Sequence, residues 1–350
     1  MSTPPIPLHA FLASQGFEDA LATELGARGP SAGEARWPSV VTRRGELPAP
    51  IDPVFARQQL PVVAMVRGDT ASAAAESVFE AIAPTFDADE RPFTVHVFTP
   101  NAEQYQTLAP LVRPLDAALR ATLRERRRVA FRRCVERPSL ARWAETLVIQ
   151  VAVVGKRSLL VSAARPRALP SGGFDIAPWP AGIAPVADDR TAPSRAYGKF
   201  EEGLAWLGIA PAAGEVCVDL GGSPGGWAWK TLSRGARVIA VDRTALSPPA
   251  FGHPALEMIV GNAFTYRPPS PVDWLLCDVI CEPHRTIELA DHWMREGLCR
   301  RVVATIKFKG KDGYGVLADA RTRLAAHGWQ HLRLKHLERH HNEAVILAAR

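Results

Sequence analysis

The amino-acid sequence predicts an α/β fold for the C-terminal half of the chain and a mixed α+β fold for the N-terminal half. Two observations support the α/β prediction. Short, continuous apolar runs alternate with segments of helical periodicity, which is typical of a parallel sheet buried on both faces. Polar residues follow directly after several of these runs, where the carboxyl ends of the strands would lie. A length of 350 residues suits two domains of ordinary size.

In the C-terminal half, the predicted strands are apolar runs that end at a glycine or a polar residue. They cover residues 216–220, 238–241, 256–260, 274–277, 302–306 and 344–348. Helices are predicted between them at residues 226–234, 287–296 and 319–327. Because the carboxyl ends of neighbouring parallel strands share one edge of a sheet, we expect one cleft there. The polar residues expected to line it are Asp219, Asp242, Asn262, Asp278 and Lys307.

The N-terminal half has a weaker pattern. Helices are predicted at residues 16–25 and 111–128, and strands at residues 62–66, 93–98 and 147–153. A stretch rich in proline and glycine, residues 166–193, has little periodicity and indicates a boundary. We therefore predict an N-terminal α+β region (residues 1–170), a linker (171–194) and a C-terminal domain (195–350).

Composition excludes several classes of protein. No apolar run approaches the roughly 18 residues that span a bilayer, so no membrane partner is expected. Residues 1–10 lack the pattern of a signal peptide, and we expect a cytoplasmic protein. The five cysteines match no zinc spacing, so no metal is predicted. Cys217 and Cys277 lie in apolar runs and are expected to be buried, reduced thiols.

The formal net charge is +6, and its distribution is more informative than its size. Seven arginines crowd one short segment: Arg124, Arg126, Arg127, Arg128, Arg132, Arg133 and Arg137. Such a cluster is compatible with contact to nucleic-acid phosphates. It is equally compatible with a solvated helix face, and the sequence does not decide between the two.

The strongest local motif is DLGGSPGGW, residues 219–227, between a predicted strand and a predicted helix. Its glycines permit a tight turn and the close approach of a ligand. Pro224 interrupts the G-x-G-x-x-G spacing of dinucleotide-binding folds. Asp242 ends the next predicted strand, where a carboxylate can bind both hydroxyls of an adenosine ribose. We therefore favour a nucleoside site over a simple strand-to-helix turn.

This loop resembles the S-adenosylmethionine loop of the FtsJ-like ribose 2′-O-methyltransferases, which have a Rossmann-like catalytic domain. That family carries a Lys-Asp-Lys-Glu tetrad, and its members occur here in the same order as Lys199, Asp278, Lys307 and Glu343. The resemblance implies that these four residues are catalytic and that the cofactor is S-adenosylmethionine. The cofactor contacts implied are Ser194, Gly221, Ser223, Pro224, Gly225, Gly226, Trp227, Asp242, Asn262 and Asp278.

A closer resemblance is to the RlmM family, which methylates a cytidine ribose in large-subunit ribosomal RNA. Residues 178–183 and 192–195 are similar to the start of its catalytic domain, and residues 16–18 and 55–58 to its N-terminal part. The N-terminal half of that family contains a THUMP domain, an RNA-binding module, and the resemblance implies one here. The implied partner is ribosomal RNA before full assembly of the large subunit.

The tetrad has a physical interpretation. Methyl transfer to a ribose requires that the hydroxyl be aligned and lose its proton. A lysine with its ordinary pKa of about 10.4 is protonated and cannot act as a base. We predict that Lys307 accepts the proton, as the resemblance implies, with its pKa lowered by burial and by the neighbouring cation Lys199. Asp278 and Glu343 are expected to orient the two amines and balance their charge.

Two other function classes are compatible with these residues. One is a methyltransferase that acts on a small molecule or a protein, against which the tetrad and the basic N-terminal half argue. The other is a non-catalytic RNA-binding factor in ribosome assembly. Asn262, which stands where the family usually has an acidic residue, favours that second class, whereas the complete tetrad argues against it. A monomer is the simplest expectation, and the nucleotide methylated is not encoded in any motif.

Two further segments have competing interpretations. His336, His340 and His341 suggest metal ligation, but we favour a solvated approach to the last strand. Residues 307–313 form a basic loop beside the predicted proton acceptor. Contact with the RNA backbone and an ordinary surface loop are equally compatible with that loop.

Overall fold

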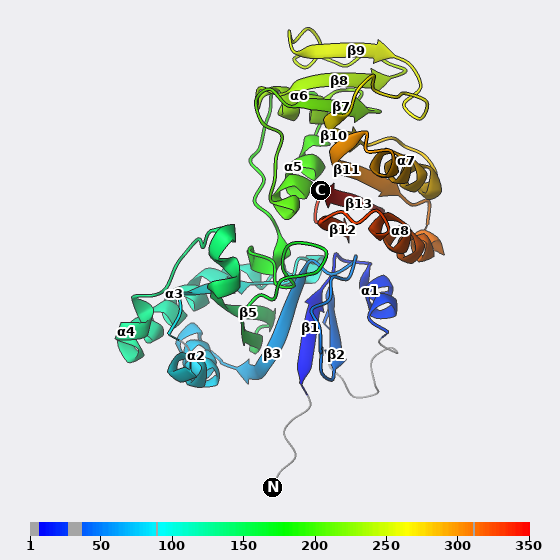
Figure 1. Cartoon of the computed structure of the whole chain (residues 1–350). Helices are drawn as coiled ribbons and strands as arrows, with labels where there is room; N and C mark the ends of the chain where they lie inside the picture. The colour runs from blue at the N-terminus through cyan, green and yellow to red at the C-terminus, as the bar shows by residue number, and fades with distance from the viewer. Residues whose placement is uncertain (1–6, 27–36, 89, 311) are drawn as a thin grey trace. The chain divides into compact units, whose positions relative to one another are not determined.

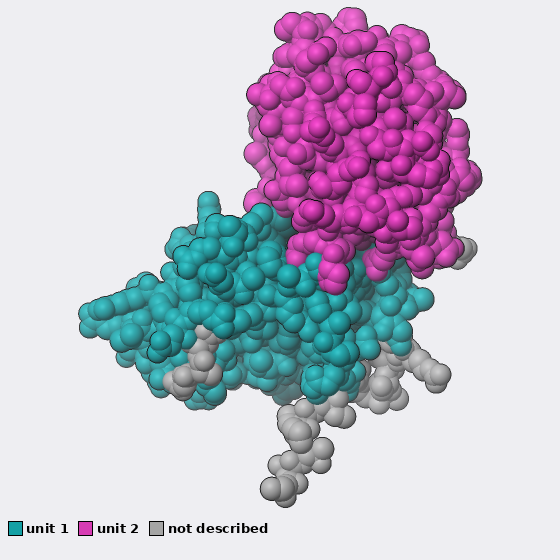
Figure 2. Space-filling view, in the orientation of Figure 1, with its two compact units in different colours: residues 1–169, 174–183 teal, residues 170–173, 184–350 magenta. Residues whose placement is uncertain are grey.

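A computed structural model describes residues 7–26, 37–88, 90–310 and 312–350 of the chain. The chain divides into two compact units, which Figure 2 shows in different colours. The N-terminal unit comprises residues 1–169 and 174–183, and the C-terminal unit comprises residues 170–173 and 184–350. No helix in the described ranges is long and apolar enough to cross a membrane.

The N-terminal unit is built on a six-stranded sheet with the order β2-β1-β3-β6-β5-β4. The strands are β1 (Leu8–Leu12), β2 (Val40–Arg44), β3 (Gln58–Arg67), β4 (Phe93–Phe98), β5 (Leu147–Gly155) and β6 (Ser158–Ala164). Neighbouring strands pair antiparallel except β4 and β5, which are parallel. The helices are α1 (Glu18–Glu24), α2 (Ala71–Ala88), α3 (Ala109–Arg126) and α4 (Arg128–Phe131).

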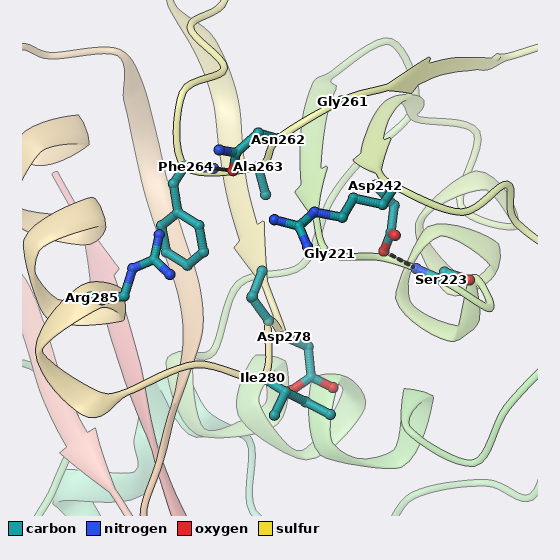
Figure 3. A pocket seen from close by; sticks show the side chains of 12 residues that line it. Gly221, Ser223, Asp242, Gly261, Asn262, Ala263, Phe264, Asp278, Ile280 and Arg285 are labelled. Carbon is teal, nitrogen blue, oxygen red and sulfur yellow. Dashed lines mark hydrogen bonds between the residues drawn. The ribbon is translucent and has the colours of Figure 1, made fainter.

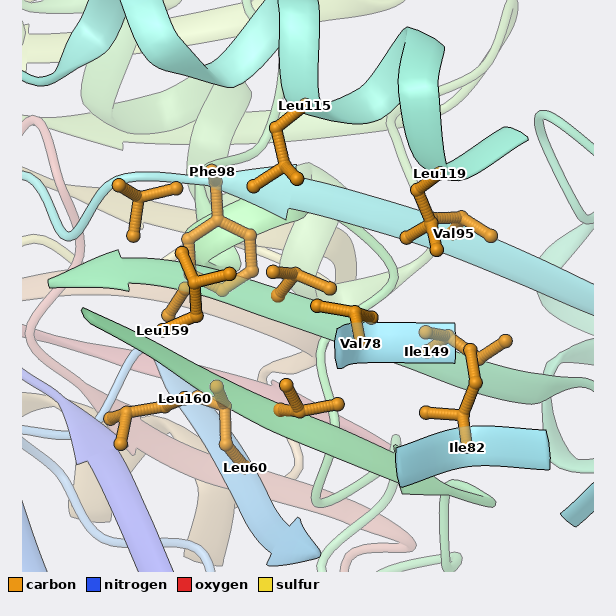
Figure 4. Close-up of a cluster of buried hydrophobic side chains, with 14 of the residues drawn as sticks. Leu60, Val78, Ile82, Val95, Phe98, Leu115, Leu119, Ile149, Leu159 and Leu160 are labelled. Carbon is orange, nitrogen blue, oxygen red and sulfur yellow. The ribbon is translucent and has the colours of Figure 1, made fainter. Parts of the chain in front are cut away.

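The core of this unit lies between the sheet and helices α2 and α3, which also pack on each other (Figure 4). Helix α3 buries Leu115, Leu119 and Leu123, which recur every four residues and form one apolar stripe. Ile149 of β5 is fully buried in the same core. The arginine-rich end of α3 continues into α4 on the solvent side of this stripe, so the core leaves most of those side chains exposed or half-buried.

The C-terminal unit contains a seven-stranded sheet with the order β12-β13-β11-β10-β7-β8-β9. The strands are β7 (Val216–Leu220), β8 (Arg237–Asp242), β9 (Leu256–Val260), β10 (Val272–Cys277), β11 (Cys299–Lys307), β12 (His331–Lys335) and β13 (Glu343–Ala349). Helices α7 (Pro283–Arg295) and α8 (Val316–Ala325) cover one face, and α5 (Tyr197–Leu207) and α6 (Gly226–Leu232) cover the other (Figure 1).

Strands β7 to β11 are parallel, and the strand order reverses direction between β7 and β10. In an open α/β sheet, ligands bind beyond the carboxyl ends of the strands at such a reversal. Strand β13 differs, because it runs antiparallel to both β11 and β12. In that register Lys307, the last residue of β11, lies opposite Glu343, the first residue of β13.

The predicted strands of the C-terminal half and the α/β fold are confirmed. Cys217 and Cys277 are fully buried free thiols, as expected. The prediction of a wholly parallel sheet is wrong for the last strand, because an apolar run does not record the direction of the chain. The α-helices and strands that the sequence pattern did not indicate are β1, β2, β6, β12, α2, α4 and α5.

Candidate active site

A cleft of about 430 Å³ opens at the carboxyl ends of β7, β8 and β10 in the C-terminal unit (Figure 3). The residues that line it are Gly221, Ser223, Asp242, Arg243, Gly261, Asn262, Ala263, Phe264, Asp278, Val279, Ile280 and Arg285. The cleft therefore lies at the reversal of strand order, where the sheet topology places a ligand site.

The loop after β7 depends on a glycine at its first position. Gly221 has a φ of +73°, and a Cβ atom there would come within 2.4 Å of the Val279 side chain. Any larger residue would be strained and would collide with the segment after β10. Asp242 holds the same loop, because one carboxylate oxygen accepts the Ser223 N–H at 3.0 Å and the other accepts the Thr244 N–H at 3.0 Å.

The inner side of the cleft is strongly acidic. Asp219 is fully buried below the loop. Burial, together with the charges of Asp278 and Asp242, raises the pKa of Asp219 to about 7. Asp278 and Asp242 therefore lie close enough to oppose the ionisation of Asp219. A site of this kind favours a ligand that carries positive charge.

The outer wall of the cleft is formed by an arginine stacked on an aromatic ring. The Arg285 guanidinium lies 3.8 Å from the centroid of the Phe264 ring, and Figure 3 shows the two side chains next to each other. A planar guanidinium gains a cation–π interaction in this arrangement. The Asn262 side chain lies next to this pair, and its Oδ1 accepts the Phe264 N–H at 3.0 Å.

Beyond Asp278, two lysines and two carboxylates form a connected cluster. Lys307 Nζ donates to Asp278 Oδ1 at 2.6 Å and to Glu343 Oε2 at 3.1 Å. Lys199 Nζ forms an ion pair with the other oxygen of Glu343, Oε1. All four side chains are less than one-fifth exposed. Lys199 lies on α5, Lys307 on β11 and Glu343 on β13, and Asp278 directly follows β10, so the four residues are brought together only by the fold.

The protonation of this cluster differs from the expectation that the pKa of Lys307 is lowered. Burial acts to lower that pKa, but the carboxylates of Asp278 and Glu343 outweigh burial and raise it above its ordinary value. Burial acts to raise the pKa of Glu343, but Lys307 and Lys199 hold it below its ordinary range. The expected lowering is wrong for the free protein, because Lys307 touches two anions whereas Lys199 is paired with Glu343.

Of the ten residues predicted to bind a cofactor, Gly221, Ser223, Asp242, Asn262 and Asp278 line the cleft. The other five, Ser194, Pro224, Gly225, Gly226 and Trp227, are not among the lining residues. Ser194 packs against Gly226, where an added Cβ would come within 2.4 Å of its Oγ. Trp227 donates to the Ala196 carbonyl at 2.9 Å and stacks on Phe200 at 5.1 Å, so it ties α6 to α5.

Sequence reasoning missed several residues of the cleft. Arg243 and Phe264 each lie within two residues of a predicted position, so a predicted site extended by two residues beyond each strand end would have included them. Ile280 likewise lies two residues after Asp278, whereas Arg285 carried no such signal. Arg285 lies on α7 and reaches the cleft only through its stacking on Phe264.

The histidines before β13 are not a solvated face, which corrects that expectation. His336 is fully buried and His340 is 5% exposed, whereas His341 is exposed. The side chains turn inward because they hold the loop backbone. His336 Nδ1 lies 2.8 Å from the Glu343 carbonyl, and His340 Nδ1 accepts the Leu337 N–H at 3.2 Å. Lys311 of the basic loop lies outside the described residues.

The sheet order, the glycine loop after β7 and the carboxylate that ends β8 are those of a Rossmann-like domain with a site for a nucleoside ligand. Residues 192–334 match the FtsJ-like methyltransferase family. The chain is 32% identical, over 96% of its length and 92% of the relative, to the ribosomal RNA large subunit methyltransferase M of Alkalilimnicola ehrlichii. The chain belongs to the family of ribosomal RNA large subunit methyltransferase M.

Further comparisons cover different shares of the chain. The methyltransferase M of Laribacter hongkongensis is 39% identical over 158 residues, which are 43% of this chain and 44% of that protein. Among solved structures, TrmN from Thermus thermophilus is similar over 98% of this chain and 99% of that one, with 14% identity and a TM-score of 0.34.

Proposed function

We propose that this protein transfers a methyl group from S-adenosylmethionine to a ribose 2′-hydroxyl of large-subunit ribosomal RNA, at a cytidine. Its family membership makes it a ribosomal RNA methyltransferase. The observation that supports transfer to a ribose oxygen is the cluster in which Lys307 contacts both Asp278 and Glu343 and Lys199 contacts Glu343. A hydroxyl needs such a group to take its proton, whereas a stronger nucleophile would not.

S-adenosylmethionine supplies the methyl group on a positively charged sulfur, and the cleft suits it. Asp242 and Asp278, which line the cleft, provide negative charge that favours a cation. Each carboxylate oxygen of Asp242 accepts one backbone N–H and keeps a lone pair that a ribose hydroxyl can use. Asn262 keeps an amide NH₂ that can donate to a ring nitrogen of adenine, where a carboxylate could only accept.

Lys307 is the proton acceptor in this proposal. Its two carboxylate partners orient Nζ and retain its proton in the free protein. Only the deprotonated fraction of the amine can accept a proton from the substrate hydroxyl. A cation held beside Asp278 would compete for that carboxylate and lower the pKa of Lys307. Thr305, which donates to Asp278 Oδ1 at 2.6 Å, keeps the carboxylate in place.

We propose that the N-terminal unit binds the RNA and contains a THUMP domain. Its arginines at the end of α3 and in α4 provide positive charge for phosphates. Arg126 is paired with Glu76 at 2.8 Å and Arg124 stacks on Phe131 at 5.0 Å, so the cluster is partly ordered before RNA binds. We further propose a monomer that works in the cytoplasm, on RNA that is not yet fully assembled.

Transfer of labelled methyl from S-adenosylmethionine to protein-free large-subunit ribosomal RNA tests the proposal, with the modified nucleotide mapped. We expect label on a single ribose. An RNA fragment that carries a 2′-deoxycytidine at the mapped position is the matched control and should take up no label. Label on a base, or on the deoxy control, would refute ribose transfer. Cofactor binding without any labelled RNA would instead favour another substrate or an assembly factor.

A further inference from the structure

Helix α5 contacts the start of β13 and the loop that precedes it through two side chains, Lys199 and Glu202, that are about one helical turn apart. Lys199 forms its ion pair with Glu343, the first residue of β13. Glu202 contacts the loop that precedes β13, residues 336–342. Residues three apart on a helix lie on one face, so both side chains project toward the same segment. The helix carries a cation for the tetrad and, beside it, an anion that no part of the proposed mechanism uses.

The Glu202 carboxylate is buried and bonded to backbone. It is 1% exposed, although glutamate is among the residues least often fully buried. One oxygen accepts the Glu338 N–H at 3.0 Å and the other accepts the Arg339 N–H at 2.9 Å. Two consecutive backbone N–H groups that converge on one anion form strong, charge-assisted hydrogen bonds. These bonds offset the cost of burying the charge, and they fix the middle of the loop to α5.

Hydrogen bonds within the loop couple the backbone of Glu338 and Arg339 to the position of Glu343. His336 bonds the Glu343 carbonyl through Nδ1, and His340 accepts the Leu337 N–H. Arg339 lies over Gly198 of α5, where a Cβ atom would come within 2.9 Å of its side chain. A displacement of the backbone at residues 338 and 339 therefore moves the start of β13 as well.

We propose that Glu202 is a positioning residue, which holds the backbone of Glu338 and Arg339 and thereby places Glu343 between Lys199 and Lys307. This inference rests on the proposed function for its catalytic meaning, but its geometry does not. Glu202 makes the contacts that carry the proposal to the backbone N–H groups of Glu338 and Arg339. It acts through the loop, and it links the helix that carries Lys199 to the strand that carries Glu343.

The protonation of Lys307 provides a readout that ordinary destabilisation would not move. The charged or titratable groups that face it are Asp278 directly after β10, Glu343 from β13, Lys199 from α5 and His340 from the loop. Glu343 is one of the two carboxylates that raise the pKa of Lys307. If Glu343 withdraws, that contribution weakens and the pKa of Lys307 falls.

The test compares Glu202→Gln with Glu201→Gln in the full chain. Glutamine at residue 202 keeps one acceptor oxygen but presents an NH₂ group to the second backbone N–H. Glu201 is the matched control, because its replacement removes the same charge from the same helix. Its carboxylate pairs with Arg234 at 2.6 Å, away from the loop. Lysine titrations are followed by NMR in cofactor-free protein labelled at the lysine side chains, and Lys307→Met assigns the signal.

We expect Glu202→Gln to lower the pKa of Lys307 by about half a unit or more, whereas Glu201→Gln leaves it in place. An unchanged pKa in folded Glu202→Gln would overturn the proposal, as would an equal shift in both variants. If Glu202→Gln does not fold, Glu202→Asp replaces it, because it keeps the carboxylate but shortens the reach. No RNA is involved in the titration, so failure of the proposed ribose methylation would appear separately, in the methyl-transfer assay of the wild type.

Discussion

Replacement of Lys307 by methionine isolates the role of its amine. Methionine has a similar length and fills the same space, but it has no charge and no proton to exchange. The ammonium of Lys307 contacts Asp278 at 2.6 Å and Glu343 at 3.1 Å. After the change, Glu343 still has Lys199 and Asp278 still has Thr305, so both carboxylates keep one partner.

The expected magnitudes follow from these contacts. A positioned general base contributes about 10²–10⁴-fold in rate, which corresponds to about 3–5 kcal/mol in the barrier. Loss of one partner from a buried ion pair costs about 3–5 kcal/mol in stability. For Lys307→Met we expect a smaller loss of stability, about 2 kcal/mol, since the Lys307 side chain is 19% exposed and each carboxylate keeps a partner. Affinity for the cationic cofactor should stay the same or increase, because a positive charge beside Asp278 is removed.

Single-turnover methyl transfer, calorimetry with S-adenosylmethionine and urea denaturation measure the three quantities separately. Lys335→Met is the matched control, because Lys335 is also buried in the C-terminal unit and its ammonium lies 5.2 Å from the Trp206 ring. We expect that control to lose stability but to keep the rate of its folded fraction. A Lys307→Met rate within about threefold of wild type would refute the assignment of the base.

Three other predictions address the site and the RNA. Because its carboxylate partners raise the pKa of Lys307 in the free protein, kcat/KM should rise by up to about tenfold per pH unit between about pH 7 and 9, and a flat profile would contradict Lys307 as base. Asp242→Ala should weaken S-adenosylmethionine binding by about tenfold or more in calorimetry, and unchanged affinity would count against its ribose contact. Replacing Arg126, Arg127 and Arg128 together by glutamine should lower RNA affinity and reduce the slope of log affinity against log salt concentration by about 2. An unchanged slope would indicate that these arginines form only a solvated helix face.

Local sequence was sufficient to predict the centre of the fold. The strands around Val218, Leu276 and Val303 are continuous apolar runs, because a parallel sheet covered by helices on both faces buries every side chain. The glycine loop was likewise predictable, since Gly221 has both a positive φ and a close neighbour that exclude other residues. The N-terminal unit was less predictable, because its sheet depends on pairings between distant segments, such as β1 with β3 and β3 with β6.

Sequence and family resemblance together predicted the four residues of the tetrad, but they predicted the wrong direction for the pKa shift of Lys307. The sign of a pKa shift depends on which charges are nearest in space, and order along the chain does not contain those distances. Lys307 meets Asp278 and Glu343, whereas Lys199 meets Glu343. Its pKa is therefore raised rather than lowered in the free protein.

The sequence by itself determined the order of the strands and helices of the catalytic half and the polar residues at the strand ends. Both follow from local properties, namely apolar periodicity and the backbone freedom of glycine. Only the tertiary structure decided that β13 runs antiparallel to β11, which brings the first residue of one strand to the last residue of the other. It also decided that Arg285 closes the cleft and that Glu202 holds the loop before Glu343. These contacts join segments up to 137 residues apart, and no local pattern along the chain records them.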